Sequence, residues 1–256
     1  MMIKFRDLRV AAALLALIPA QAGAQSKEKF LEAFSGDWLI FDTSFSTTAA
    51  PCMLTLGTTI ELRGVVEESQ LHLGATPKNC VEPLSNVTAW DIDQNQLLLF
   101  SEQNTLIARL GGNQRRVTGD IEGSFASIVL ERTTGDPFQP GFSNALKKHR
   151  CIYLGYSSTC ATSDDLALPV MGQDGGVVAS LGVIVQLNVR DQPRRDSRVV
   201  GTLPPETCLK VNYCTTASDG IWCRARFGEA SGWVAKTALR QSEWPVVTFV
   251  NGCSEP

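Results

Sequence analysis

The side chains with the clearest chemistry in this 256-residue sequence are eight cysteines, and that chemistry is disulfide formation. They are Cys52, Cys80, Cys151, Cys160, Cys208, Cys214, Cys223 and Cys253. The number is even, and no Cys-x-x-Cys spacing indicates a metal site. Eight thiols allow about a hundred pairings. Proximity along the chain suggests Cys52 with Cys80, Cys151 with Cys160, Cys214 with Cys223 and, by elimination, Cys208 with Cys253.

Groups suited to catalysis are scarce. The chain has two histidines, and we expect both His72 and His149 to face solvent, because neither has a cysteine or carboxylate nearby at metal-ligand spacing. The acidic pairs Glu67-Glu68 and Asp164-Asp165 lie in turn-like segments and are expected to be solvated. We therefore expect no catalytic residues, no metal site and no cofactor, so the sequence predicts a protein that is not an enzyme.

A second set of side chains suits binding. Trp222, Trp233 and Tyr213 could form an aromatic groove, with Arg190, Arg224 and Arg226 at its rim. The alternative is that at least one tryptophan is a core residue and that the arginines form a solvated face, because a small barrel needs large side chains inside. Both interpretations stay open at this stage.

The start of the chain predicts export. Basic residues come first, followed by an apolar run from Val10 to Ala20 and by the small residues Ala22 and Ala24. This is the pattern of a signal peptide over residues 1–24, with a mature chain beginning at Gln25; the alternative is a buried N-terminal helix. The run is too short to span a bilayer, and no later run is long or apolar enough. We therefore expect a periplasmic or secreted protein, in which cysteines oxidise.

Charge is distributed unevenly along the expected mature chain. Residues 25–133 contain 8 basic and 14 acidic residues, a net charge of −6, whereas residues 181–240 contain 9 basic and 5 acidic residues, a net charge of +4. Neither value indicates binding to nucleic acid.

Most of the secondary-structure elements that position these side chains are expected to be strands. In residues 25–133, short alternating runs predict strands at residues 38–41, 53–56, 59–62, 70–73, 89–92, 96–100, 106–110, 117–121 and 127–130. Only residues 27–34 show helical periodicity. About eight short antiparallel strands suit an up-and-down barrel or a sandwich.

The pattern weakens over residues 134–180, where turn residues at 135–137, 139–141 and 172–176 predict a connector that contains a Cys151–Cys160 knuckle. Strands resume at residues 183–189, 198–203, 208–213, 220–227 and 231–235, which predicts a small five-stranded barrel followed by a tail to residue 256.

The C-terminal part resembles the bacterial SH3 domain family. The likeness covers about sixty residues and includes Leu187-Asn188-Val189-Arg190, Gly220-Ile221-Trp222-Cys223-Arg224 and Ser231-Gly232-Trp233-Val234, closing with Leu239. The resemblance implies a targeting module that recognises peptidoglycan or a peptide, with Arg190, Tyr213, Trp222, Arg224 and Trp233 as its ligand groove.

The N-terminal part looks like the periplasmic family that inhibits secreted alkaline zinc metalloproteases. The residues that carry the likeness include Gly36-Asp37-Trp38, the run Cys52-Met53-Leu54-Thr55-Leu56, Trp90, Leu97-Leu98-Leu99-Phe100 and Leu130-Glu131-Arg132, over roughly a hundred residues. The resemblance implies a lipocalin-like barrel of eight strands. It also implies that the mature N-terminus, here Gln25-Ser26-Lys27, enters the protease cleft as a trunk whose terminal amine faces the zinc.

Two departures from that family concern the trunk. Gln25 stands where the family has a small residue, and Lys27-Glu28-Lys29 makes the segment unusually charged, so a plain helical lead-in is the alternative.

Together these patterns predict an all-β fold, an eight-stranded lipocalin-like antiparallel barrel plus a small SH3-like barrel joined by a disulfide-containing connector. The leading hypothesis is an exported binding protein that inhibits a secreted metalloprotease and is tethered to cell wall or partner. The alternatives are a non-inhibitory envelope adaptor that binds peptidoglycan or peptide, and a carrier of a small apolar ligand.

Overall fold

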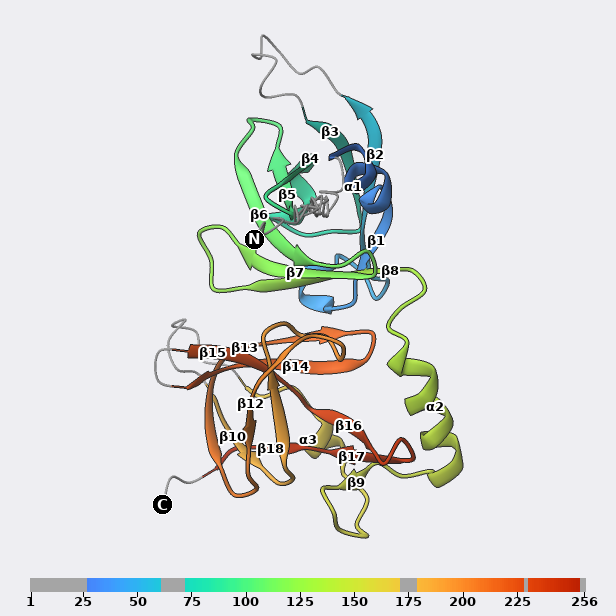
Figure 1. The fold of residues 1–256 in the computed structure, drawn as a ribbon, viewed down its shortest axis with the longest axis vertical. Helices are drawn as coiled ribbons and strands as arrows, with labels where there is room; N and C mark the ends of the chain where they lie inside the picture. Colours follow the sequence, from blue (N-terminus) through green and yellow to red (C-terminus); the bar gives the residue numbers. More distant parts are fainter. Residues whose placement is uncertain (1–26, 61–71, 171–178, 228–229, 254–256) are drawn as a thin grey trace, which may run out of the picture.

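The computed structural model describes residues 27–60, 72–170, 179–227 and 230–253. The predicted signal peptide, Gln25, Ser26 and the acidic pair Glu67-Glu68 lie outside the described residues. Two units are stacked along the long axis of the molecule (Figure 1). We call residues 27–132 the first barrel and residues 138–251 the second unit.

The first barrel is a closed ring of eight strands, each antiparallel to the next, and β8 pairs with β1. Its elements are α1 (Lys27–Phe34), β1 (Gly36–Ile40), β2 (Cys52–Ile60), β3 (Leu73–Lys78), β4 (Val87–Asp93), β5 (Gln96–Ser101), β6 (Leu106–Gly112), β7 (Arg116–Ile121) and β8 (Ser127–Arg132), with short 3-10 turns at Thr43–Phe45 and Leu84–Asn86. The prediction of an eight-stranded antiparallel barrel is confirmed, as is the helix at residues 27–34. The strand expected at residues 53–56 and the first two residues of the one expected at 59–62 belong to the single strand β2, which ends at Ile60; residues 61 and 62 lie outside the described residues.

Large side chains fill the inside of this barrel. Trp38 and Trp90 are fully buried there, together with leucines such as Leu54 and Leu99. The indole N–H of Trp38 donates to the carbonyl of Phe34 (2.8 Å), and that of Trp90 donates to the carbonyl of Gly57 (2.9 Å). Both buried donors are thereby satisfied, which removes the cost of burying a polar N–H in an apolar interior.

The two histidines are packed on aromatic rings, so the expectation of solvated histidines is wrong. The His72 ring is stacked on Phe100, with centroids 4.1 Å apart. His149 lies 4.2 Å from Trp244, centroid to centroid, and its ring also contacts Tyr153 edge-on.

The second unit contains one large and one small sheet. Its elements are α2 (Phe138–His149), β9 (Tyr153–Leu154), α3 (Ser163–Leu166), β10 (Ala179–Val183), β11 (Leu187–Arg190), β12 (Val199–Leu203), β13 (Cys208–Ala217), β14 (Gly220–Phe227), β15 (Ala230–Ala235), β16 (Thr237–Arg240), β17 (Trp244–Val247) and β18 (Phe249–Asn251). The large sheet has the order β12-β11-β15-β14-β13-β10-β18, and the small one has the order β16-β17-β9. The strands expected for a five-stranded barrel therefore lie within a sheet of seven, and the likeness to an SH3 domain stays a prediction.

Residues 134–180 are largely part of the second unit. Helix α2 runs beside β16 and β17, β9 pairs with β17 in parallel, and α3 contacts β18 (Figure 1). The turn predicted at residues 139–141 is wrong, because these residues lie inside α2. Pro140 is tolerated there because it falls in the first helical turn, where a backbone N–H has no partner within the helix.

All four suggested disulfides are present: Cys52–Cys80, Cys151–Cys160, Cys208–Cys253 and Cys214–Cys223. Four disulfides fit an oxidising compartment such as the periplasm or the outside of the cell. Within the part of the chain that the structure describes, no helix is both long enough and apolar enough to cross a membrane.

Candidate functional site

The predicted aromatic groove is covered by the first barrel. Tyr213, Trp222 and Trp233 come together on the face of β13, β14 and β15, but Trp222 is only 1% exposed and Trp233 only 7%. Val129 of β8 packs against this cluster, and the hairpin of β7 and β8 lies across the same strands in Figure 1. Four of the five groove residues therefore serve the contact between the units. Arg190, the fifth, lines a cavity of the second unit, and Trp222 also contributes to the wall of that cavity.

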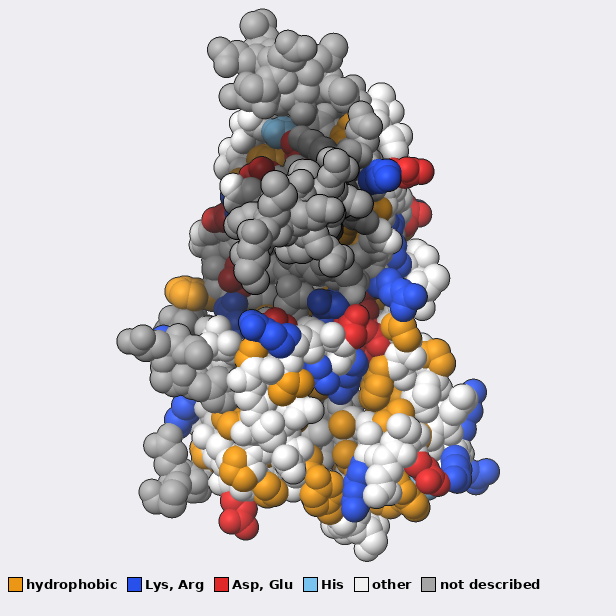
Figure 2. All heavy atoms as spheres, in the orientation of Figure 1, with side chains coloured by type: hydrophobic (Ala, Val, Ile, Leu, Met, Phe, Trp, Pro, Cys, Tyr) orange, Lys and Arg blue, Asp and Glu red, His pale blue; other side chains and the backbone are white. Residues whose placement is uncertain are grey.

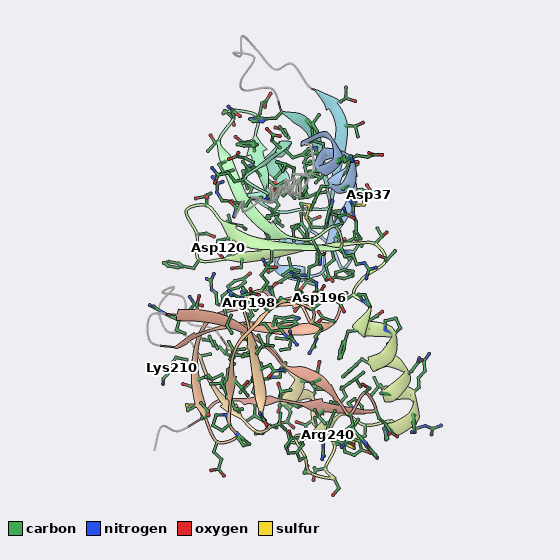
Figure 3. All side chains as sticks on the ribbon, in the orientation of Figure 1. Asp37, Asp120, Asp196, Arg198, Lys210 and Arg240 are labelled. Atoms are coloured by element: carbon green, nitrogen blue, oxygen red, sulfur yellow. A yellow bond between two sulfur atoms is a disulfide. The ribbon has the colours of Figure 1, made fainter. Side chains whose placement is uncertain are left out.

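Arg224 joins the rim of this contact. Its guanidinium donates to the Asp120 carboxylate (2.7 Å), to the Ser127 hydroxyl (3.0 Å) and to the carbonyl of Phe125 (3.1 Å), all on the first barrel. Figure 3 shows Asp120 on the hairpin of β7 and β8, directly above the second unit. The expectation that Arg224 belongs to a solvated face does not hold, because its side chain is mostly covered by these contacts.

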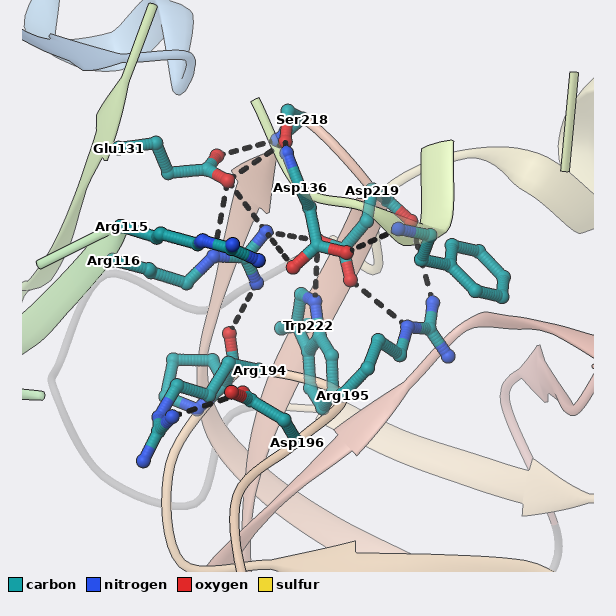
Figure 4. A network of polar contacts seen from close by, with 12 residues as sticks. Arg115, Arg116, Glu131, Asp136, Arg194, Arg195, Asp196, Ser218, Asp219 and Trp222 are labelled. Atoms are coloured by element: carbon teal, nitrogen blue, oxygen red, sulfur yellow. Dashed lines mark hydrogen bonds and ion pairs between the residues drawn. The ribbon is translucent and has the colours of Figure 1, made fainter. Parts of the chain in front are cut away.

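A buried polar network forms the centre of the interface (Figure 4). Arg116 of β7 is 3% exposed and forms ion pairs with Glu131 of β8 (2.6 Å) and with Asp219 of the second unit (2.7 Å). Glu131 also accepts hydrogen bonds from the backbone N–H and the hydroxyl of Ser218, both 2.7 Å. Asp136 lies 3.4 Å from Arg116. We call these residues, with Arg195, the arginine network.

Charge balance makes this network stable in a buried place. Burial alone would lower the pKa of Arg116, but attraction to Asp219, Glu131 and Asp136 outweighs it and raises that pKa. A charge that is paired and hydrogen-bonded on all sides can be buried, whereas an unpaired one could not. The network therefore fixes the first barrel to the second unit.

A further buried hydrogen bond crosses the interface. The Thr215 hydroxyl donates to the Asp42 carboxylate over 2.9 Å, and both residues are buried. Burial, with a further contribution from Asp42, raises the pKa of the neighbouring Tyr213 far above its usual value, so its hydroxyl stays neutral.

The second unit contains a cavity of about 390 Å³ on the other side of Trp222. The lining residues that matter for its chemistry are Phe138, Tyr156, Arg190, Arg195, Trp222 and Arg240. A volume of this size is within the range of small-ligand sites, which combine apolar walls with a few polar groups. Hydrophobic side chains gather over the second unit on the face seen in Figure 2, while charged ones gather where the units meet.

Arg195 connects the cavity to the arginine network. Its Nε is 2.9 Å from Asp219, and one terminal nitrogen donates to the carbonyl of Thr237 (2.7 Å). Its guanidinium also lies over the rings of Phe138 (4.1 Å) and Trp222 (4.9 Å). Asp219 therefore pairs with Arg116 on one side and with Arg195 on the other, and it also accepts the indole N–H of Trp222 (3.0 Å).

Helix α1 is fixed on the first barrel (Figure 1). The rings of Phe30, Phe34 and Trp38 form a stacked row, with centroids 6.4 and 5.9 Å apart. Arg132, the last residue of β8, lies 4.1 Å over Trp38 and donates to the carbonyls of Ala33 and Ser35. Burial lowers the pKa of Arg132, and Asp37 partly offsets this. Of the predicted trunk, Lys27 is the first residue of α1.

Sequence reasoning did not find the cavity or the arginine network. The cavity needs Phe138, Tyr156 and Arg240, which are far apart in the sequence and lack a shared motif. One signal for the interface was present: Ile128-Val129-Leu130 is a continuous apolar run, and a strand that is apolar on both faces is expected to be covered on both. Ile128 and Leu130 face the barrel core and Val129 faces the second unit.

Comparison with known proteins adds no family, because neither a protein-family model nor a curated protein matches the sequence. Within the described residues, no three His, Cys, Asp or Glu side chains come together as a metal-binding group.

Proposed function

We propose that the chain is an exported binding protein whose first barrel inhibits a secreted zinc metalloprotease. The observation that supports this most is the attachment of α1, because the helix begins at Lys27, the last residue of the trunk Gln25-Ser26-Lys27, and is held on the barrel by Trp38 and Arg132. An eight-residue helix has little stability of its own in water, so this packing is what holds it in place.

The chemistry of inhibition would come from the terminal amine. A catalytic zinc keeps one coordination position for water or substrate, and a neutral amine can occupy it. A trunk that begins from a fixed helix loses less conformational freedom on entering a cleft than one that begins from a loose chain, which favours binding.

The test compares the mature chain with a variant that lacks residues 25–29, in a peptide-hydrolysis assay with a serralysin-type protease. The mature chain should slow hydrolysis and the shortened one should not. Replacing Lys78 with Gln, at the end of β3, serves as a control outside the trunk and should leave inhibition intact. Equal inhibition by the mature and shortened chains, or none by either at micromolar excess, would rule out the trunk mechanism.

The second candidate is an envelope adaptor without a protease target, in which an SH3-like second unit binds peptidoglycan or a peptide. The observation that favours it is the arginine-lined cavity of the second unit. Retention of the full chain on purified peptidoglycan sacculi at both low and high salt, with no effect on the protease, would support the adaptor. A carrier of small apolar ligands is less consistent with the structure, because side chains fill the first barrel.

A further inference from the structure

The cavity of the second unit is built by three segments that are distant in the sequence. Helix α2 contributes Phe138, the Cys151–Cys160 knuckle contributes Tyr156, and β16 contributes Arg240. The large sheet supplies the remaining wall through Arg190 and Trp222. In Figure 3, Arg240 lies at the end of the second unit that is farthest from the first barrel. The contact between the units therefore leaves this part of the cavity open.

Two of the three arginines at the cavity have no acidic partner. Arg195 is neutralised by Asp219, whereas neither Arg190 nor Arg240 forms an ion pair with a carboxylate of the described residues. One terminal nitrogen of Arg190 donates to the carbonyl of Ser197 (2.6 Å), and Asp191 and Asp196 act on its charge only from a longer distance. Unpaired guanidinium groups in a partly desolvated cavity favour an anionic ligand, carboxylate or phosphate.

The knuckle positions an aromatic ring beside one of these cations. The guanidinium of Arg240 lies 4.5 Å over the ring of Tyr156, which is 56% exposed. The parallel pairing of β9 with β17 and the disulfide hold this turn in place. Stacking on an exposed ring limits the conformations of Arg240, so fewer are lost when a ligand binds. The disulfide-closed loop therefore has a structural role at the rim of the cavity.

A second hollow of about 350 Å³ borders the same Tyr156–Arg240 pair. Its wall includes Tyr153 and Trp244, and Trp244 is 37% exposed. An elongated ligand could therefore place its charge at Arg240 and its apolar groups against aromatic rings on both sides. Gln186 and Asn188 at the cavity are exposed and offer amide donors and acceptors of the kind that pair with peptide groups.

We propose that this cavity binds a short peptide ending in a free carboxylate, with Arg240 holding the carboxylate, Arg190 adding positive charge to the cavity wall and Tyr156 contacting the side chain next to the carboxylate. Guanidinium groups, amide side chains and aromatic rings together match the carboxylate, the peptide groups and the side chains of such a ligand. The site would supply the adaptor candidate with its ligand. It is independent of protease inhibition by the first barrel, since no residue of the trunk takes part.

Calorimetric titration of the full mature chain tests the proposal. The ligands are an N-acetylated tripeptide with an apolar last residue and a free carboxylate, the same tripeptide as its C-terminal amide, and a version ending in D-alanine. The acids should bind, and the amide should bind at least about tenfold more weakly, because it lacks the charge that pairs with arginine. Preference for the D-alanine acid would indicate a cell-wall stem peptide, and preference for the all-L acid a protein C-terminus.

Variants locate the binding. Arg240→Gln should weaken binding of the acid about tenfold and Tyr156→Ala several-fold, whereas Arg198→Gln should have no effect. Arg198 is a matched control, because it is an exposed arginine of the same unit that does not line the cavity (Figure 3). Near-ultraviolet circular dichroism should be the same for all variants.

Several results would overturn the proposal. These are binding of acid and amide with equal affinity, equal effects of Arg240→Gln and Arg198→Gln, or no heat with any of the peptides. Inorganic phosphate that binds as tightly as the acid would show a plain anion site instead of a peptide site. None of these outcomes depends on the protease assay, so failure here and failure of inhibition can be told apart.

Discussion

The arginine at the interface between the units and the arginine at the cavity differ in burial and in their partners. Arg116 is buried and contacts Glu131, Asp219 and Asp136, whereas Arg240 is exposed and contacts only the ring of Tyr156 among the partners found for its side chain. A buried guanidinium that is paired with carboxylates stabilises the fold, whereas an exposed one without such a partner keeps donors that a ligand could use. This difference is the basis for treating Arg116 as structural and Arg240 as the arginine of the proposed binding site.

The largest loss of stability that can test this comparison should come from replacing the buried Arg116. Arg116→Met removes the cation that pairs with Glu131 and Asp136 and leaves Asp219 with Arg195 alone, and we expect the free energy of unfolding to fall by about 3–5 kcal/mol. The neighbouring Arg115 is exposed, so Arg115→Met should change the free energy of unfolding by less than about 0.5 kcal/mol. Urea unfolding followed by tryptophan fluorescence measures both. Similar losses for the two variants would contradict a structural role of the network.

A smaller effect is expected from the buried hydrogen bond between Thr215 and Asp42, which crosses the same interface. Thr215→Val removes the donor to the buried Asp42 carboxylate and should cost about 1–3 kcal/mol in unfolding free energy. Thr216→Val is the control, because it changes the next residue of β13 in the same way and has no bond to the first barrel among the described residues. If Thr216→Val proves as costly as Thr215→Val, the bond to Asp42 is not the cause.

Lys236 represents an intermediate case, a cation that is buried but paired with a neutral group. It is 1% exposed, and its Nζ donates to the Asn251 side chain (2.7 Å). Burial lowers its pKa from 10.5 to about 8, and Asp165 opposes this shift. Between these two values the unfolded chain holds a proton that the folded chain has released, so stability should rise with pH across that window, by at most about 1.4 kcal/mol per pH unit.

A variant without the Lys236 amine isolates the increase in stability with pH that this group causes. Lys236→Met has no proton to release, so the difference in unfolding free energy between the normal chain and the variant should shift in favour of the normal chain from about pH 8 to about pH 10. Below about pH 8 both states are protonated and the difference should be flat. The raised pKa of Tyr213 acts equally in both proteins and cancels. A difference that is flat over the whole range would mean that the amine keeps its normal pKa.

The smallest effect on stability is expected at the cavity. Arg240→Gln should alter the free energy of unfolding by less than about 0.5 kcal/mol, since Arg240 is exposed and has no ion pair among the described residues. The same urea experiment measures it. A loss close to that of Arg116→Met would show that Arg240 is structural, which would end the distinction between the two regions.

Local patterns predicted the elements of this protein better than their contacts. Three of the four disulfides follow from nearness in sequence and Cys208–Cys253 follows by elimination. The alternation of residues 117–121 predicts a strand that differs from β7 by a single residue. Helix α2 was missed because Pro140 and Gly141 are strong turn residues, and sequence alone does not show that Pro140 falls in the first turn.

Contacts between distant segments account for the rest. The aromatic cluster of Trp222 and Trp233 was expected, but its cover was not, because Val129 lies about a hundred residues earlier in the chain. The sequence left open whether Trp222 is a core residue or lines a groove. In the structure it is buried toward the first barrel and also forms part of the wall of the cavity. Sequence separation of this size leaves no local periodicity to detect.

The contact of Arg132 with α1 has a consequence for the order in which the molecule is completed. Arg132 is almost a hundred residues after the helix whose carbonyls it holds, and it pairs with Trp38 across the seam that closes the ring. Helix α1 is therefore synthesised well before Arg132, and the contact that holds the helix on the barrel can form only after β8 has been made.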